Sequence, residues 1–279
     1  MSAVLPADVV WQIKTADPRL MAAWLDNDCP AQEVVFELSG SPEDEKIVGA
    51  ASGATLPFDL YLAPPGWTPP PAEAAWRDRI AALRAQGGRR WEISHWAALD
   101  WLGGADAARA AGVVWGTDWP LYALNRHAAQ QWFELGAAWC VLSPEDEGRN
   151  LCALTRLYGA RLAVPVFQHT PLFQSVTPPA WPPETAAAAE AGGFREARGR
   201  SDRRYRTTQR HGLCETFQES PFSLGGRLRE LYEAGARRFR VDLLRGTFSA
   251  DEVRVLCDEL KADRAPPGAH VGNYDRGLA

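Results

Sequence analysis

One stretch of the sequence decides the fold: Gly116-Thr117-Asp118-Trp119-Pro120-Leu121-Tyr122-Ala123-Leu124-Asn125, followed one helix later by Val141-Leu142-Ser143-Pro144-Glu145. In each piece a hydrophobic run ends in a polar turn. Between them, Arg126–Leu135 carries apolar residues at helical spacing. This is the length of one β-strand/α-helix repeat. In a parallel barrel, the carboxyl ends of the strands carry the chemistry, so the polar turns indicate where a site would lie.

The same kind of apolar run recurs along the chain, and several runs are continuously apolar, as strands buried on both faces are. Helical patterns lie between the runs, and one of them begins with Ser249 and Glu252 spaced as a capping box. Strand and helix alternating eight times predict a single (βα)₈ barrel of the TIM type. The predicted strands are Val9–Lys14, Val34–Leu38, Phe58–Ala63, Trp91–Trp96, Val113–Thr117, Trp139–Ser143, Arg161–Phe167 and Phe239–Leu244.

The predicted helices are Pro18–Leu25, Ala72–Gln86, Arg126–Leu135, Gly148–Tyr158, Leu224–Ala234 and one starting after Ser249, with weaker patterns around Pro42–Gly49 and Trp96–Ala111.

The 279 residues suit one barrel domain over residues 1–279. A long insertion over residues 168–222 separates the seventh strand from the following helix, and we expect it to cover the barrel mouth. Residues 265–279 form a tail after the last helix. Loops of this length inside a compact domain are usually functional or disordered.

Composition limits the function. The formal net charge is −5, so the whole surface does not favour nucleic acid or an anionic membrane. No apolar run approaches the ~20 residues that span a bilayer, and the first residues lack the features of a signal peptide. The five cysteines are scattered without a CxxC pair. These features predict a cytoplasmic protein with reduced thiols and no membrane partner.

Polar residues at the predicted strand ends are candidates for acid–base chemistry, because these ends converge on one mouth. The alternative is that they form structural ion pairs. His95 and His169 could hold a metal with Glu92 or Asp118, but no tight ligand spacing occurs, so we expect hydrogen-bonded histidines and no metal. No nucleophile elbow is present, and Ser143 is expected to cap the next helix. The catalytic candidates are Glu92, His95, Asp118, Glu145, His169 and Asp242, and Lys14, Glu37, Ser143 and Arg245 also lie at strand ends.

An arginine cluster in the insertion is the sharpest charge feature of the chain, and it is interleaved with Phe194 and Tyr205. Arginines among aromatic residues are typical of sites for single-stranded RNA or other phosphates. The alternative is a solvated loop whose arginines pair with acidic groups around the mouth. The predicted anion- or RNA-binding residues are Arg198, Arg200, Arg203, Arg204, Arg206 and Arg210, together with Arg245 at the last strand.

Five motifs, in this order, resemble the collagenase-like peptidases, family thirty-two among the peptidases of unassigned mechanism. They are Asp118-Trp119-Pro120-Leu121 with Asn125, Val141-Leu142-Ser143-Pro144-Glu145, Asp202-Arg203, Phe239-Arg240-Val241-Asp242 and Gly272-Asn273-Tyr274-Asp275-Arg276-Gly277-Leu278. Members of this family include proteins of oxygen-independent hydroxylation, which act on transfer RNA, ribosomal RNA or a ubiquinone precursor. The resemblance implies a cluster held by four cysteines in such members.

Only Cys214 occupies a position like that of a cluster ligand here, and no cysteine lies between Cys152 and Cys214. A four-iron cluster needs about four converging thiolates. We therefore expect no iron–sulfur cluster and no other cofactor.

Three functions remain open. The first is a cluster-less relative that binds the substrate or a partner in a hydroxylation system acting on RNA or a small molecule. Its partners would be a cluster-bearing relative and RNA or an anionic small molecule. The second is a peptidase or other hydrolase with its site at the barrel mouth. The third is a sensor or scaffold without chemistry.

Overall fold

The computed structural model describes residues 5–26, 29–177, 195–198 and 203–277. Eight parallel strands form a closed barrel, because β13 pairs with β1 and with β7, while β7 also pairs with β6. The predicted TIM-type barrel is thus confirmed. The strands are β1 (Val10–Thr15), β2 (Glu33–Glu37), β3 (Asp59–Ala63), β4 (Arg90–Ile93), β5 (Val114–Thr117), β6 (Trp139–Val141), β7 (Leu162–Gln168) and β13 (Arg238–Asp242).

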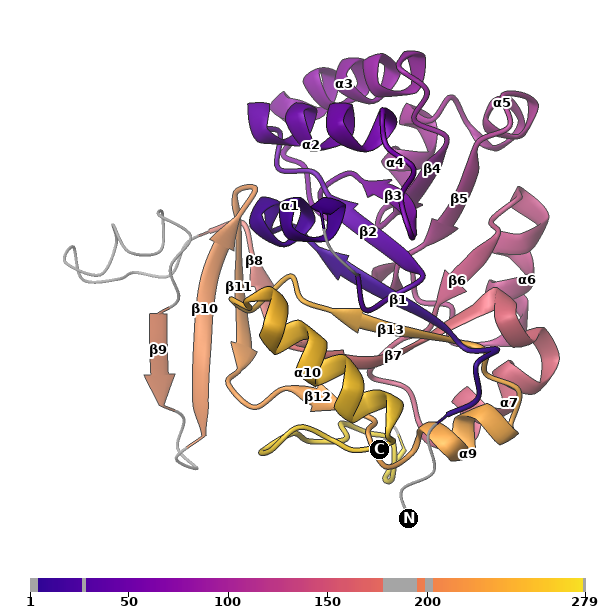
Figure 1. Cartoon of the computed structure of the whole chain (residues 1–279), viewed down its shortest axis with the longest axis vertical. Helices are drawn as coiled ribbons and strands as arrows, with labels where there is room; N and C mark the ends of the chain where they lie inside the picture. Colours follow the sequence, from indigo (N-terminus) through magenta and orange to yellow (C-terminus); the bar gives the residue numbers. More distant parts are fainter. Residues whose placement is uncertain (1–4, 27–28, 178–194, 199–202, 278–279) are drawn as a thin grey trace.

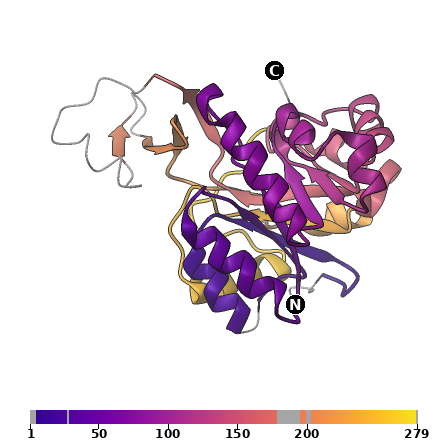
Figure 2. The ribbon, with the colours of Figure 1, turned by 90° about the horizontal axis from the view of Figure 1, so that it is seen from above.

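Helices surround this barrel (Figures 1 and 2). Asn125 caps α6, accepting hydrogen bonds from the amides of His127 and Ala128 at 3.0 Å. Ser249 and Glu252 form the predicted capping box of α10. The fourth strand ends earlier than expected: Trp96 opens a helix, because the chain turns at His95. The helices are α1 (Pro18–Asp26), α2 (Pro42–Ser52), α3 (Glu73–Ala85), α4 (Trp96–Trp101), α5 (Ala105–Ala110), α6 (Arg126–Leu135), α7 (Gly148–Tyr158), α9 (Leu228–Glu233) and α10 (Ala250–Lys261).

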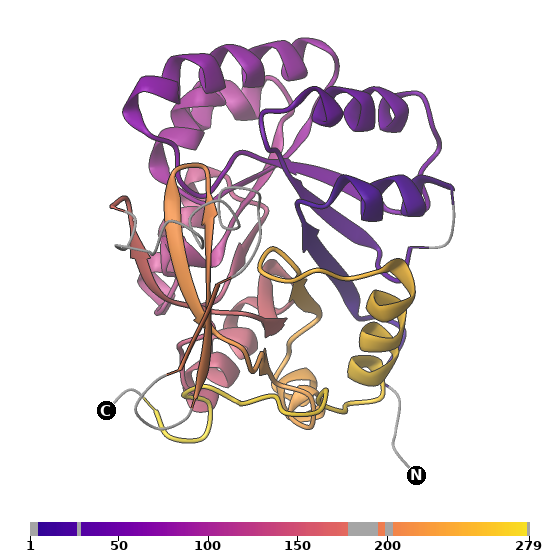
Figure 3. The ribbon, with the colours of Figure 1, turned by 90° about the vertical axis from the view of Figure 1, so that its left-hand side faces the viewer.

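A second, antiparallel sheet lies between β7 and β13 in the sequence. Its strand order is β8-β11-β10-β9, with β8 (Pro171–Ser175), β9 (Arg195–Arg198), β10 (Arg204–Arg210) and β11 (Leu213–Gln218). β12 (Phe222–Ser223) returns to the barrel and pairs with β7. Residues 178–194 and 199–202 of the predicted insertion lie outside the described residues. Figure 3 looks toward the carboxyl ends of the barrel strands, and the β10–β11 hairpin stands in front of this mouth.

The barrel interior has two unlike halves. We call one the apolar wall: Val35, Tyr61, Ala63, Trp119, Trp139, Val141 and Ala163. The other, the charged wall, consists of Gln12, Lys14, Glu33, Glu92, Arg240 and Asp242, all buried. The apolar wall requires glycine at position 116, because a Cβ atom there would overlap the indole of Trp139. The glycine in the deciding stretch therefore leaves room for the indole of Trp139.

The C-terminal tail packs against the start of α7. The ring of Tyr274 lies so close to Gly148 that a Cβ there would come within 2.6 Å of it. The amide of Gly148 donates to the carbonyl of Tyr274 at 3.0 Å, and Asn273 Nδ2 donates to the carbonyl of Glu145 at 3.0 Å. Two of the sequence motifs thus contact each other, at the side of the barrel. Among the described residues, no helix combines the length and apolar character that crossing a bilayer requires.

Candidate functional site

Lys14 is the centre of the candidate site. It lies at the end of β1 and is fully buried. Its Nζ lies 2.6 Å from Asp118 Oδ2, 3.0 Å from Glu92 Oε1 and 3.6 Å from Glu37 Oε2. The network therefore joins the ends of β1 and β2 to the ends of β4 and β5, across as many as 104 residues of sequence.

The charges in this network stabilise one another. Burial alone would lower the pKa of Lys14, but the nearby charges of Asp118, Glu92 and Glu37 outweigh it and raise that pKa. Likewise burial would raise the pKa of Asp118, and the charges of Lys14 and Arg240 lower it instead. The lysine is thus a fixed cation. A neutral amine, which a nucleophilic lysine needs, is disfavoured here.

A lower layer supports the network from inside the barrel. The Arg240 guanidinium pairs with both oxygens of Glu92, and its Nε donates to Gln12 Oε1 at 2.8 Å. Gln12 Nε2 donates to Glu33 Oε2 at 2.8 Å. Glu33 in turn accepts from Arg238 at 3.0 Å. Breaking one member of such a buried network leaves an uncompensated charge, so these residues hold Glu92 in place.

The tip of the β10–β11 hairpin closes one side of the mouth. His211 and Gly212 have φ values of +51° and +78°, as the two central residues of a type I′ turn require. Beside the turn, Arg210 donates to Glu37 Oε1 at 2.7 Å and to the carbonyl of Leu244 at 3.1 Å. These contacts hold the tip against the ends of β2 and β13.

A hollow of about 170 Å³ lies between this tip and the charged network. Trp67, Trp119 and Leu213 supply the apolar part of its lining. Three carboxylates and two arginines line it: Asp118, Glu37, Glu215, Arg210 and Arg245. Arg210 pairs with Glu37 and Arg245 with Glu215, both at 2.7 Å, and Asp118 pairs with the buried Lys14, which Glu92 and Glu37 also approach. The mouth is therefore polar but close to neutral.

Two further polar side chains, Ser94 and His211, line this hollow. Ser94 Oγ donates to Asp118 Oδ2 at 3.0 Å. His211 lines the hollow, with Nε2 at 3.8 Å from Glu37 Oε1. Burial lowers the pKa of His211, opposed by the charge of Glu37, so the imidazole is mainly neutral at neutral pH.

Asp242 is the third catalytic candidate near Lys14, and it lies on the charged wall as the register partner of that lysine. Its Oδ1 accepts from the amide of Leu244 at 2.9 Å, and its Oδ2 has no hydrogen-bond partner among the described residues. Burial raises its pKa, although the charges of Arg245 and Lys14 oppose the shift. Glu92, Asp118 and Asp242 are thus brought together.

His95, in contrast, contacts the helix that follows it. Its ring packs edge-on against Trp101 with 5.0 Å between ring centroids. Burial lowers its pKa, and its Nε2 has no hydrogen-bond partner within the described ranges. His95 is a half-buried residue beside the helix that it opens.

Glu145 and His169 also lie away from the Lys14 network. The Glu145 side chain is exposed, and its carbonyl holds the C-terminal tail. His169 lines a hollow of about 960 Å³ beside α10, where its Nδ1 lies 3.3 Å from the carbonyl of Gln218. Ser143 accepts a hydrogen bond from the amide of Glu145 at 3.2 Å. It therefore closes a turn, while the expected cap position of α7 is taken by Glu147.

The predicted arginine cluster is distributed over several contacts. Arg206 pairs with Glu219 at 2.8 Å, and Arg204 lies 3.7 Å from the same carboxylate. Arg210 and Arg245 belong to the mouth pairs described above, and Arg203 is exposed. The side chain of Arg198 and the whole of Arg200 lie outside the described residues. Anion or RNA binding by these arginines stays a prediction.

The cysteines do not suit an iron–sulfur cluster. Cys140, Cys152, Cys214 and Cys257 lie on β6, α7, β11 and α10, and Cys29 precedes β2. Within the part of the chain that the structure describes, no three His, Cys, Asp or Glu side chains gather as a metal site. A four-iron cluster needs about four converging thiolates, and these cysteines, on separate elements, do not supply them.

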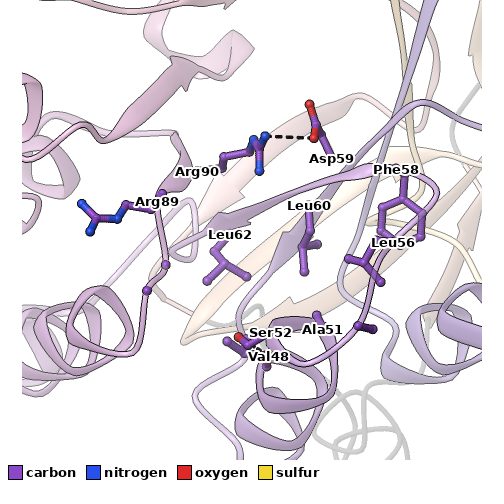
Figure 4. A pocket seen from close by; sticks show the side chains of 13 residues that line it. Val48, Ala51, Ser52, Leu56, Phe58, Asp59, Leu60, Leu62, Arg89 and Arg90 are labelled. Atoms are coloured by element: carbon purple, nitrogen blue, oxygen red, sulfur yellow. Dashed lines mark hydrogen bonds and ion pairs between the residues drawn. The ribbon is translucent and has the colours of Figure 1, made fainter.

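A different hollow, of about 350 Å³, lies at the opposite end of the barrel (Figure 4). Leu56, Phe58 and Leu60 line it, and Arg90 pairs with Asp59 at 3.0 Å across its rim. These residues precede or begin β3 and β4, so the hollow opens at the amino ends of the strands. This end of a TIM barrel generally serves stability.

Several residues of the candidate site were not predicted as such from the sequence. Lys14 and Glu37 were recognised as strand-end residues but were not catalytic candidates, although a lysine after an apolar run was a usable signal. Ser94, Trp67 and His211 were missed. The His211-Gly212 pair is a type I′ turn signal that could have located the hairpin.

The chain resembles other barrels in shape. No family model matches it, and no curated protein matches it. A 3-hexulose-6-phosphate synthase is 13% identical, with a TM-score of 0.47 over 92% of this chain and 100% of that chain. A chitinase from Paenibacillus sp. str. FPU-7 is 10% identical, with a TM-score of 0.46 over 91% of this chain and 32% of that chain. Likenesses at this level carry no functional argument, so function must be argued from the site.

Proposed function

We propose that this protein is a binding barrel that takes a small molecule without net charge into its mouth. The observation that carries this proposal is that every charged side chain lining the 170 Å³ hollow is paired with an opposite charge of the protein. An anionic ligand would meet arginines whose charges are already offset by Glu37 and Glu215, and it would be repelled by those two carboxylates. A neutral polar ligand can bind while every pair stays intact.

The same pairing favours a small molecule over RNA. Arg206, Arg210 and Arg245 each contact a carboxylate, which screens them from phosphates. The affinity of proteins for RNA comes largely from unscreened phosphate contacts. The mouth is also smaller than the ~300–1,000 Å³ typical of drug-sized ligands, so its occupant has few heavy atoms.

The resemblance to the collagenase-like peptidases suggests a context for this binding. In that context, the protein is the cluster-less, substrate-binding component of a hydroxylation system, and a cluster-bearing relative supplies the chemistry. The buried Lys14 network supports a binding role. Its protonated lysine is a poor nucleophile, and Asp118, whose pKa is lowered, is a poor base.

Ligand-observed NMR with matched sets of small neutral, anionic and cationic compounds tests the proposal. Leu213→Trp fills the hollow, whereas Leu172→Trp places the same side chain on β8, where Leu172 is 51% exposed. We expect neutral compounds to bind the wild type and Leu172→Trp, and to lose binding in Leu213→Trp. Binding dominated by anions, or binding that survives in Leu213→Trp, would overturn the proposal. Bound compounds should be recovered unchanged after long incubation.

A hydrolase is the second candidate, and His211 is the observation that favours it. A neutral imidazole facing the hollow, 3.8 Å from Glu37, has the properties of a general base. The test is turnover of a bound compound by wild type and by His211→Asn, since asparagine tolerates the left-handed turn. Turnover that is lost in His211→Asn supports the hydrolase, and turnover that persists excludes this role for His211.

A further inference from the structure

We infer that the ligand of the mouth is an uncharged ring bearing several hydroxyl groups, of the size of one monosaccharide. This inference rests on the proposed function and names its ligand class. It is carried by the combination of two indoles with paired charges around one small hollow.

The apolar contribution comes from Trp67 and Trp119. Trp67 belongs to the loop after β3 and Trp119 follows β5, so the two indoles line the hollow from the two sides of β4. The face of an aromatic ring is electron-rich and attracts the polarised C–H bonds that a sugar presents on one face. A fully charged or linear ligand would use these surfaces less well.

The polar contribution alternates acceptors with donors. Glu37 and Glu215 each accept from an arginine, and Glu215 also accepts from Gln174 at 2.8 Å. A carboxylate offers about four lone-pair directions and a guanidinium has five N–H donors, so each pair keeps capacity for a further contact. A hydroxyl group both donates and accepts, which suits such pairs. A phosphate or carboxylate ligand could only accept and would face Glu37 and Glu215 unfavourably.

The same chemistry excludes an apolar ring. Entry into the hollow removes water from the Arg210–Glu37 and Arg245–Glu215 pairs, and a ligand without hydroxyl groups cannot replace those hydrogen bonds. Sites built to bind hydroxyl groups reject analogues that lack them by large factors, because buried polar groups are left unpaired. The number of hydroxyl groups should therefore set the affinity.

The test is isothermal titration of the full chain with D-glucose, D-galactose, D-ribose and myo-inositol, compared with cyclohexanol and uracil. We expect at least one polyhydroxylated ring to bind, and cyclohexanol and uracil to bind more weakly. Trp67→Ala should raise the dissociation constant of that ring about fivefold to tenfold. Trp96→Ala, which removes an indole that is 57% exposed and packs on Trp132 outside the mouth, should leave the dissociation constant unchanged.

The outcomes separate the two proposals. Binding of cyclohexanol or uracil in the mouth, with none of the sugars, would overturn the ligand class and leave the binding barrel standing. Equal losses in Trp67→Ala and Trp96→Ala would also overturn it, since the indole of Trp67 would then have no specific role. If no compound of either test binds in a manner that Leu213→Trp abolishes, the proposed function fails as well.

Discussion

The two halves of the barrel interior solve the problem of filling a closed barrel in opposite ways. The apolar wall fills space by shape, with Trp139 fitted over Gly116. The charged wall fills it with ions whose charges cancel, centred on Lys14. Shape packing tolerates relaxation of neighbours, whereas a buried ion network fails when one charge is removed. The charged wall extends into the mouth, so the same network that fills the barrel also shapes the candidate site.

Removing the central cation should break the charged wall most severely. Lys14→Met leaves Asp118, Glu92 and Glu37 without their shared partner, and breaking a buried ion pair costs about 3–5 kcal/mol of unfolding free energy. Urea denaturation measures this. Lys46→Met is the matched control. Lys46 is exposed and its ion pair with Glu43, at 3.7 Å, lies on the surface, where such pairs contribute little to the free energy of unfolding. A loss below about 1 kcal/mol in Lys14→Met would show that the network is not needed for stability.

Crowding the apolar wall should have a smaller effect. Gly116→Ala forces a methyl group into the space of the Trp139 indole, and overpacking of this kind costs about 1–3 kcal/mol. Thermal unfolding checks the value. Trp139→Leu in the same background should restore part of the loss. Gly49→Ala is the control, because nothing lies within 4 Å of the added atom and alanine favours the helix.

The smallest expected effect is a difference in how the free energy of unfolding depends on pH for variants of two carboxyl groups, Asp242 and Asp118. Burial raises the folded-state pKa of Asp242, so its contribution to stability is present below the ordinary pKa and is lost as pH rises through the raised one. Asp242→Asn should therefore gain stability relative to the wild type as pH rises from about 4 to about 7. Denaturant titrations at several pH values measure this difference.

Asp118 should behave in the opposite way. Lys14 and Arg240 overcome its burial and lower its pKa, so its contribution is present above the ordinary pKa and is lost as pH falls through the lowered one. Asp118→Asn should accordingly cost more stability at neutral pH than in acid. Parallel pH profiles for Asp242→Asn and Asp118→Asn would contradict the assigned environments.

The sequence supported the barrel because each strand is a short apolar run, and this signal is local. Helix ends such as Asn125 and Ser249 were also readable, since caps depend on neighbouring residues. Glu92, Asp118 and Asp242 were placed at one mouth by the barrel geometry alone. Their partners were not readable, because Lys14 meets Asp118 across 104 residues and Arg210 meets Glu37 across 173. His95 packs against Trp101 and His169 lies near the carbonyl of Gln218 instead. These contacts were not predictable either, because a position at a strand end does not fix the contacts of its side chain.

The central claim is that the charges of the mouth neutralise one another within the protein. Calorimetric titration with whichever of the four rings binds most tightly and with its monophosphate, each at about 0.05 M and about 0.3 M NaCl, is the sharpest test of this. The account predicts that the neutral sugar binds more tightly than its phosphate and that its affinity is insensitive to salt. Tighter binding of the phosphate, with an affinity that falls steeply as salt rises, would show unpaired cations in the mouth and contradict the account.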